Sequence, residues 1–116
     1  MTIFSDRKVS ISRLKRLFSD PNPHVRRSAS RSVLTSSQKV QEDIFPLMFS
    51  DPNQDIRADA MHVAEQLDYV EKLTEGAFDR KSNVRFVARS YLISRNIQLE
   101  YRKIALKRLR TYTKKI

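Results

Sequence analysis

The stretch Leu-Phe-Ser-Asp-Pro-Asn-Pro-His-Val-Arg-Arg-Ser-Ala occupies residues 17–29, and a close copy of it follows 31 residues later. The copy, at residues 48–60, reads Met-Phe-Ser-Asp-Pro-Asn-Gln-Asp-Ile-Arg-Ala-Asp-Ala. A third copy, at residues 77–88, lacks the Ser before its Asp. All three share an Asp, an Arg six residues later, a β-branched residue before that Arg and an Ala three residues after it. The chain is therefore built from an internal repeat.

The repeat is predicted to be two helices joined by a turn. Before the first motif, Ile11 and Leu14 lie at helical spacing. Asp-Pro-Asn then ends the helix, because the residue before a proline is pushed out of the α region. After the turn, Val25, Ala29 and Val33 recur at i, i+4 and i+8, which is one face of a second helix. The pattern predicts helices at residues 7–18, 24–36, 38–49, 54–67, 69–77, 83–95 and 98–113.

The second copy resembles the HEAT-repeat family. The matching segments are Ile44-Phe45-Pro46-Leu47 in the first helix, Asp51-Pro52 in the turn, and Ile56-Arg57 with Ala60 in the second helix. The first and third copies lack an equivalent of Pro46. The resemblance covers about residues 10–95.

This resemblance implies an all-α fold, a short right-handed α-solenoid of about three helix pairs plus a basic C-terminal helix. One domain would span residues 1–116, with repeats at about 7–36, 38–67 and 69–95 and a capping helix at 98–113. The resemblance also implies that the repeated Asp and Arg form a ladder of charged hydrogen bonds between each turn and the next helix. Repetition argues for that structural role, since a catalytic site is normally assembled once. The ladder residues would be Asp20, Arg26, Asp51, Arg57, Asp79 and Arg85.

Composition excludes several classes of function. The 116 residues include one Gly, no Cys and no Trp. With a single glycine, the chain has no P-loop or G-x-G-x-x-G phosphate cradle. Without cysteines there is no disulfide framework, thiol nucleophile or zinc finger. No apolar run approaches the ~20 residues of a membrane span, and the charged N-terminus does not match a signal peptide. We therefore expect a protein of the cytoplasm or another reducing intracellular compartment, not a secreted one.

The net charge of +10 is unevenly distributed. Residues 1–40 carry +7, residues 41–79 carry −8 and residues 80–116 carry +11. The pattern indicates two basic ends separated by an acidic band, with an anionic partner for the basic ends.

The C-terminal helix is the sharpest candidate binding surface. Lys103, Lys107, Arg110 and Lys114 lie at i, i+4, i+7 and i+11, so they would form one cationic stripe, with Arg102 and Arg108 beside it. Such a stripe tolerates repulsion between like charges and could meet several phosphates or an acidic protein surface. A solvated helix face is the alternative.

Two further groups of basic residues are candidates. Arg80 and Lys81 replace the Pro-Asn of the other turns, and Arg89 follows on the next helix. Arg27 and Arg31 lie four residues apart on the second helix of the first repeat, where such arrays commonly form a concave groove. The N-terminal Lys and Arg residues are interpreted as a solvated outer face.

The acidic residues of segment 41–79, and the residue types that commonly take part in catalysis, can be interpreted in several ways. Asp55 and Asp59, or Asp68, Glu71 and Glu75, have spacings that could hold a divalent cation or act as acid and base. Solvated surface is the preferred interpretation, and self-association with a basic end of another copy is an alternative. His24 and His62 lie in different repeats with no evident Ser and Asp to complete a triad. The tyrosines could stack on bases, although helical spacing favours packing.

The sequence thus predicts a non-enzymatic docking or scaffold module, an accessory subunit of a larger assembly. Its basic ends would bind an acidic protein surface or a nucleoprotein, with no cofactor, metal or membrane involved. The alternative is a direct, sequence-independent binder of DNA or RNA phosphates. A remote alternative is a HEAT-like DNA-processing enzyme. The candidate binding residues are Arg27, Arg31, Arg80, Lys81, Arg89, Arg102, Lys103, Lys107, Arg108, Arg110 and Lys114.

Overall fold

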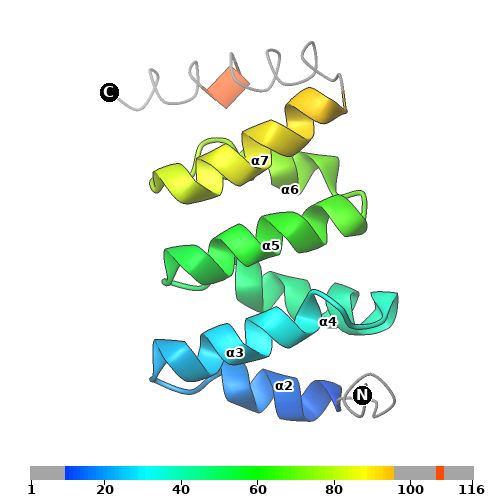
Figure 1. The fold of residues 1–116 in the computed structure, drawn as a ribbon, viewed down its shortest axis with the longest axis vertical. Helices are drawn as coiled ribbons and strands as arrows, with labels where there is room; N and C mark the ends of the chain where they lie inside the picture. Colours follow the sequence, from blue (N-terminus) through cyan, green and yellow to red (C-terminus); the bar gives the residue numbers. More distant parts are fainter. Residues whose placement is uncertain (1–9, 96–106, 109–116) are drawn as a thin grey trace.

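The computed structural model describes residues 10–95 and 107–108. This part of the chain contains helices and no strand, which confirms the predicted all-α class (Figure 1). Residues 107 and 108 are helical, and the rest of the predicted helix 98–113 lies outside the described residues. The helices are α2 (Ile11–Phe18), α3 (Pro23–Val33), α4 (Gln38–Phe49), α5 (Gln54–Gln66), α6 (Val70–Gly76) and α7 (Ser82–Ser94).

Two helix boundaries differ from the prediction by more than two residues. α2 begins at Ile11 rather than residue 7, because Ser10 is extended and its hydroxyl accepts a hydrogen bond from the Arg13 amide. α3 ends at Val33 rather than residue 36. The chain must leave the helix there, since Ser37 is the extended N-cap of α4. Local capping thus decided both ends.

The Asn of Asp-Pro-Asn begins the second helix of a pair. The side chain of Asn22 accepts a hydrogen bond from the His24 amide, and Asn53 caps α5 in the same way. At the third turn Lys81 occupies this position and makes no side-chain cap. Here the Asp79 carboxylate still accepts the Lys81 amide at 2.9 Å, so the turn keeps its shape without asparagine.

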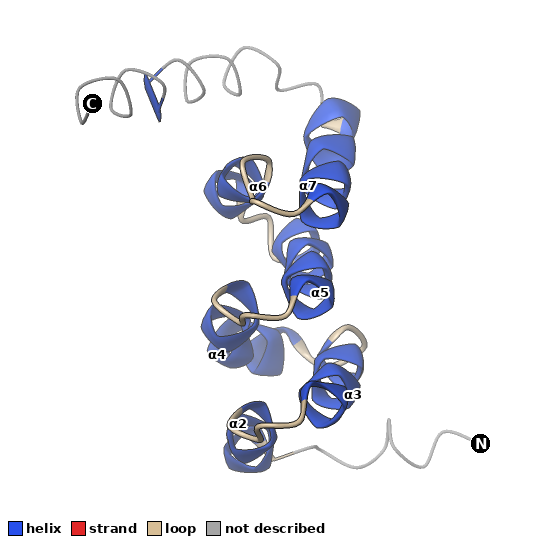
Figure 2. Cartoon of the chain, turned by 90° about the vertical axis from the view of Figure 1, so that its left-hand side faces the viewer, coloured by secondary structure: helices blue, strands red, loops and turns tan. Residues whose placement is uncertain are grey.

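The helices are arranged in two layers. α2, α4 and α6 form one layer, and α3, α5 and α7 form the other (Figure 2). α5 packs against α3, α4, α6 and α7, so it is the central helix. Its apolar residues, with those of the other helices, make one continuous core. The fully buried large side chains include Leu14, Ile44, Met48, Ile56, Met61 and Leu73.

The turn after α5 uses a left-handed residue that is not glycine. Asp68 has φ 63°, the conformation in which helices commonly end on Gly. Arg95 donates hydrogen bonds to Asp68 and Glu65, and so ties this turn to the end of α7. A chain with one glycine can therefore still make this tight helix-to-helix connection.

Candidate functional site

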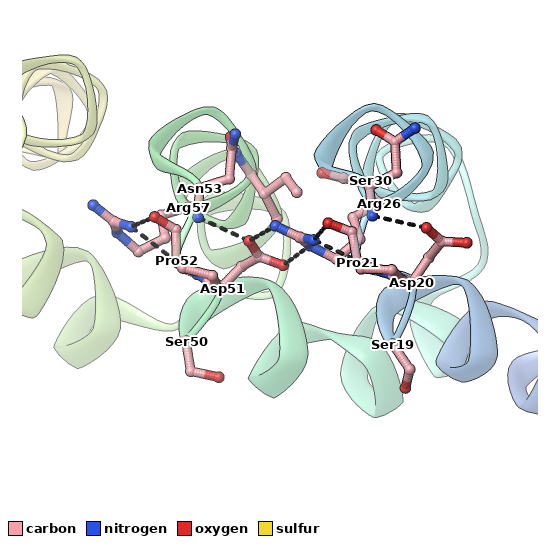
Figure 3. A network of polar contacts seen from close by, with 12 residues as sticks. Ser19, Asp20, Pro21, Arg26, Ser30, Ser50, Asp51, Pro52, Asn53 and Arg57 are labelled. Carbon is pink, nitrogen blue, oxygen red and sulfur yellow. Dashed lines mark hydrogen bonds and ion pairs between the residues drawn. The ribbon is translucent and has the colours of Figure 1, made fainter.

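Arg26 links the first turn to the second. Its Nε and Nη2 donate to the two carboxylate oxygens of Asp51, at 3.0 and 3.3 Å (Figure 3). Its Nη1 donates to the backbone oxygens of Asp20 and Pro21, at 2.9 and 3.2 Å. One guanidinium therefore holds its own turn and the next one together.

Arg57 repeats this arrangement one step further along. Its Nε and Nη2 donate to Asp79 at 2.9 and 3.0 Å, and its Nη1 donates to the oxygens of Asp51 and Pro52 at 2.9 Å each. The Arg57 side chain is only 7% exposed. The expected ladder bonds are confirmed for Arg26 with Asp51 and for Arg57 with Asp79, which link successive turns.

Acid should weaken the ladder at Asp79. Burial raises the pKa of Asp79, but hydrogen bonds from Arg57 and the Lys81 amide and the charges of Arg57 and Arg80 outweigh it, so the pKa lies below its ordinary 3.8. A lowered pKa in the folded state means that the carboxylate adds stability above about pH 4. This stability is lost as the pH falls through the folded-state pKa.

The expected result is a shallower acid dependence in Asp79→Asn than in the unaltered chain. Urea unfolding measured by circular dichroism between about pH 2 and 7 would show it, because the difference between the two curves isolates Asp79. Parallel curves for the two proteins would contradict the assignment.

The carboxylates of the acidic middle are mostly paired inside the molecule. Arg27 donates to Asp59 at 3.1 Å and lies 3.4 Å from Asp55, and the Ser30 hydroxyl donates to Asp59 at 2.7 Å. Arg27 is one of the predicted binding residues, and in the structure it forms ion pairs between α3 and α5. Within residues 10–95 and 107–108, no cluster of His, Asp and Glu could hold a metal ion.

Three residues considered for catalysis or base stacking contact other side chains within the molecule. The Nδ1 atom of His62 lies 2.6 Å from the Tyr91 hydroxyl, which links α5 to α7. Burial, with the charge of Glu65, raises the pKa of Tyr91 above 10. The ring of Tyr69 packs edge-on against Phe45, with centroids 5.2 Å apart. Both tyrosines therefore contribute to packing, while Tyr101 and Tyr112 lie outside the described residues.

A cleft of about 400 Å³ lies between the second and third turns. Its carboxylates are Asp51, Asp79 and Glu75, and each pairs with a cation: Arg26, Arg57 and Lys72 respectively. None of the three is therefore a free acid or base.

The remaining predicted binding residues fall into two groups. Arg31, Arg80, Lys81 and Arg89 are exposed and form no ion pair within the described part of the chain, although Arg89 Nε donates to the Ala77 oxygen at 3.1 Å. Lys107 and Arg108 are exposed too, and Arg108 lies 5.3 Å from the ring centre of Phe78. The other four lie outside the described residues: Arg102, Lys103, Arg110 and Lys114.

Two exposed apolar residues on α7 were missed by the sequence analysis. Phe86 is 72% exposed and Ile93 is 64% exposed. They lie seven residues apart on one face of α7, with Arg89 between them. We call Phe86, Arg89 and Ile93 the α7 face. The signal in the sequence was an apolar pair at i and i+7 beside the core stripe of Val84, Ala88 and Leu92.

The repeat alignment explains the exposure of the α7 face. Ser30 of α3 and Met61 of α5 are equivalent to Arg89, and each is fully buried against the repeat that follows. α7 is the last of the paired helices, so its equivalent positions have no following repeat among residues 10–95. The α7 face thus belongs to the last helix pair among the described residues.

Comparison of the chain with protein-family models, curated proteins and solved structures finds no match. None of the described helices is long and apolar enough to cross a membrane. Among the described residues, the two most exposed large apolar side chains, Phe86 and Ile93, lie on the α7 face, and Arg80, Lys81 and Arg89 are exposed cations of the same repeat.

Proposed function

We propose that the protein is a non-enzymatic docking module that binds an acidic protein surface through the end of its helix stack. The observation that carries the proposal is the α7 face, where Phe86 and Ile93 are exposed on either side of Arg89. Exposed aromatic residues together with Arg are typical of the centres of protein interfaces. The module would be an accessory subunit of a larger assembly.

We further propose that the helix pairs form a short HEAT-like solenoid. Three features support it: the repeated Asp-to-Arg turn, the two helix layers in Figure 2, and the ladder bonds from Arg26 to Asp51 and from Arg57 to Asp79. In such arrays each repeat contacts its neighbours and the terminal repeats need a polar outer face. Phe86 and Ile93 are exposed although residues 107 and 108 of the predicted capping helix are present, so the α7 face is a surface that a partner would cover.

A protein partner is favoured over nucleic acid by the apolar part of this surface. Burying a side chain such as Phe86 or Ile93 contributes roughly 1.5–3 kcal/mol, and phosphates cannot supply this contact. A base could stack on the Phe86 ring, but it has no such contact to make with the aliphatic Ile93. Arg27, which a groove for nucleic acid would use, is committed to Asp59. A partner that covers Phe86 and Ile93 would also lie near the exposed cations Arg80, Lys81 and Arg89. These cations favour a partner with a negatively charged surface.

Replacing both Phe86 and Ile93 with Ser should weaken binding of an acidic amphipathic helix by at least about tenfold. The probe is a fluorescent peptide of about 18 residues, with Leu on one face and Glu on the other, titrated in a fluorescence anisotropy assay. The loss is expected because the variant removes the apolar contact and keeps every cation. Leu47→Ser is the matched control, since Leu47 is also exposed, at 38%, but lies on α4.

Two results would contradict the proposal. One is equal binding by the unaltered chain and the double variant. The other is tighter binding to random duplex DNA or RNA, with an affinity that falls by about 0.9 log unit per phosphate contact for each log unit of salt. The second result would favour the direct nucleic-acid binder.

A further inference from the structure

We infer that Arg85 is the open end of the Asp–Arg ladder and that it binds a carboxylate of the acidic partner. This inference rests on the docking function proposed above and names the group in the partner that the module recognises. Arg85 is the third ladder arginine, at the position equivalent to Arg26 and Arg57.

The hydrogen bonds of the three arginines show the difference. In Arg26 and Arg57, Nη1 bonds the backbone of the preceding turn, while Nε and Nη2 bond the Asp of the next turn. In Arg85, Nη1 donates to the backbone oxygen of Asp79 at 2.8 Å. This bond corresponds to the bonds that Nη1 makes in the other two arginines. Its Nε and Nη2 have no hydrogen-bond acceptor among the described residues and are not buried.

Arg85 is therefore positioned for a carboxylate. The bond to Asp79 orients the guanidinium, so less side-chain freedom is lost when a partner binds. A planar guanidinium presents Nε and Nη2 as a fork that matches the two oxygens of a carboxylate. Phe86 is the next residue on α7, so one partner helix could contact both side chains.

An outside protein fits this end better than the chain's own residues do. After Asp79 the sequence contains a single acid, Glu100, among twelve Lys and Arg. A second copy stacked end to end could offer Asp20, which no arginine side chain pairs with in the described residues. The exposed cations of α2 would then approach those near Arg85, and like charges repel. These cations are Arg13, Lys15 and Arg16.

Arg85→Gln should weaken binding of the Leu/Glu peptide by about tenfold, because the variant removes the charged fork and keeps Phe86 and Ile93. Arg85→Lys should retain only part of the affinity, since an ammonium cannot make the paired bonds. Arg13→Gln is the matched control, as Arg13 is an exposed arginine on α2 that forms no ion pair among the described residues. A Leu/Gln peptide of the same length should bind the unaltered chain and Arg85→Gln equally.

Two checks separate this inference from the docking function and from a folding defect. Unchanged affinity in Arg85→Gln, with a loss in the variant carrying both Phe86→Ser and Ile93→Ser, would overturn the ladder inference and leave the docking function standing. Arg85→Glu should lose the Leu/Glu peptide and gain a Leu/Lys peptide, which an unfolded variant could not do. Analytical ultracentrifugation tests for a second copy. If the chain dimerises, and Asp20→Asn and Arg85→Gln each abolish the dimer, then Arg85 binds a second copy and the inference of an outside partner is wrong.

Discussion

Arg57→Met is expected to lower the free energy of unfolding by about 3–5 kcal/mol, since it removes one member of a buried ion pair. Arg57 is 5% exposed as a residue and bonds both carboxylate oxygens of Asp79 as well as the backbone oxygens of Asp51 and Pro52. Methionine fills most of the space and offers no donor. The Asp79 carboxylate and two carbonyls then lose their partners in a site with little water.

Arg85→Met is the matched control for this prediction. It removes the equivalent arginine from the same motif, but Arg85 bonds only the backbone oxygen of Asp79. We therefore expect the free energy of unfolding to fall by less than about 1 kcal/mol. Urea unfolding followed by circular dichroism measures both variants. Adding Asp79→Leu to Arg57→Met should recover part of the loss, because no buried charge then remains unpaired. Equal losses in Arg57→Met and Arg85→Met would contradict the buried ladder.

The ladder and the turns could be predicted because their information is local. Asp-Pro-Asn ends one helix and caps the next within a few residues, and the repeat spacing places each Arg after its turn. Helices α4 and α5 therefore lie within a residue of their predicted ends. The two larger errors, at the start of α2 and the end of α3, occurred where serines form caps that no repeat pattern marks.

The charge distribution along the sequence does not show which charges pair within the molecule. The acidic residues 41–79 were interpreted as a band separating two basic ends. In the structure, many of these carboxylates pair with arginines of the flanking segments, as Asp59 does with Arg27 and Glu65 with Arg95. These partners are about 30 residues apart, so their contact depends on how the repeats stack. The alternation of charge along the sequence therefore reflects ion pairs between repeats more than it indicates docking surfaces.

The α7 face was missed for a related reason. A helical pattern shows that Val84, Ala88 and Leu92 face the core, and it leaves the neighbouring stripe unassigned. Met61 is buried because another repeat follows α5. Arg89 occupies the equivalent position on α7 and is exposed, because no further repeat follows α7 among residues 10–95. Exposure at this stripe is set by position in the stack.

Gly76→Val is expected to lower the free energy of unfolding by about 1–3 kcal/mol through overpacking, and Gly76→Ala by less. Gly76 is the last residue of α6, where that helix crosses α5 and α7. A Cβ at this position would overlap the Met61 sulfur and would lie 3.2 Å from the Ala88 Cβ. The glycine is thus required for close approach between helices, since its backbone does not adopt positive φ.

A double-mutant cycle tests whether Met61 is the group that glycine accommodates. Met61→Ala alone creates a cavity and should cost about 2–5 kcal/mol, as Met61 is 1% exposed. If the clash with the Met61 sulfur sets the cost of Gly76→Val, that cost should shrink by about 1 kcal/mol or more in the Met61→Ala background. Urea unfolding of the four proteins gives the coupling. Additive losses would mean that the cost of Gly76→Val arises at the end of α6 and not from a clash with Met61. The glycine would then not be required for the close contact between α6 and α5.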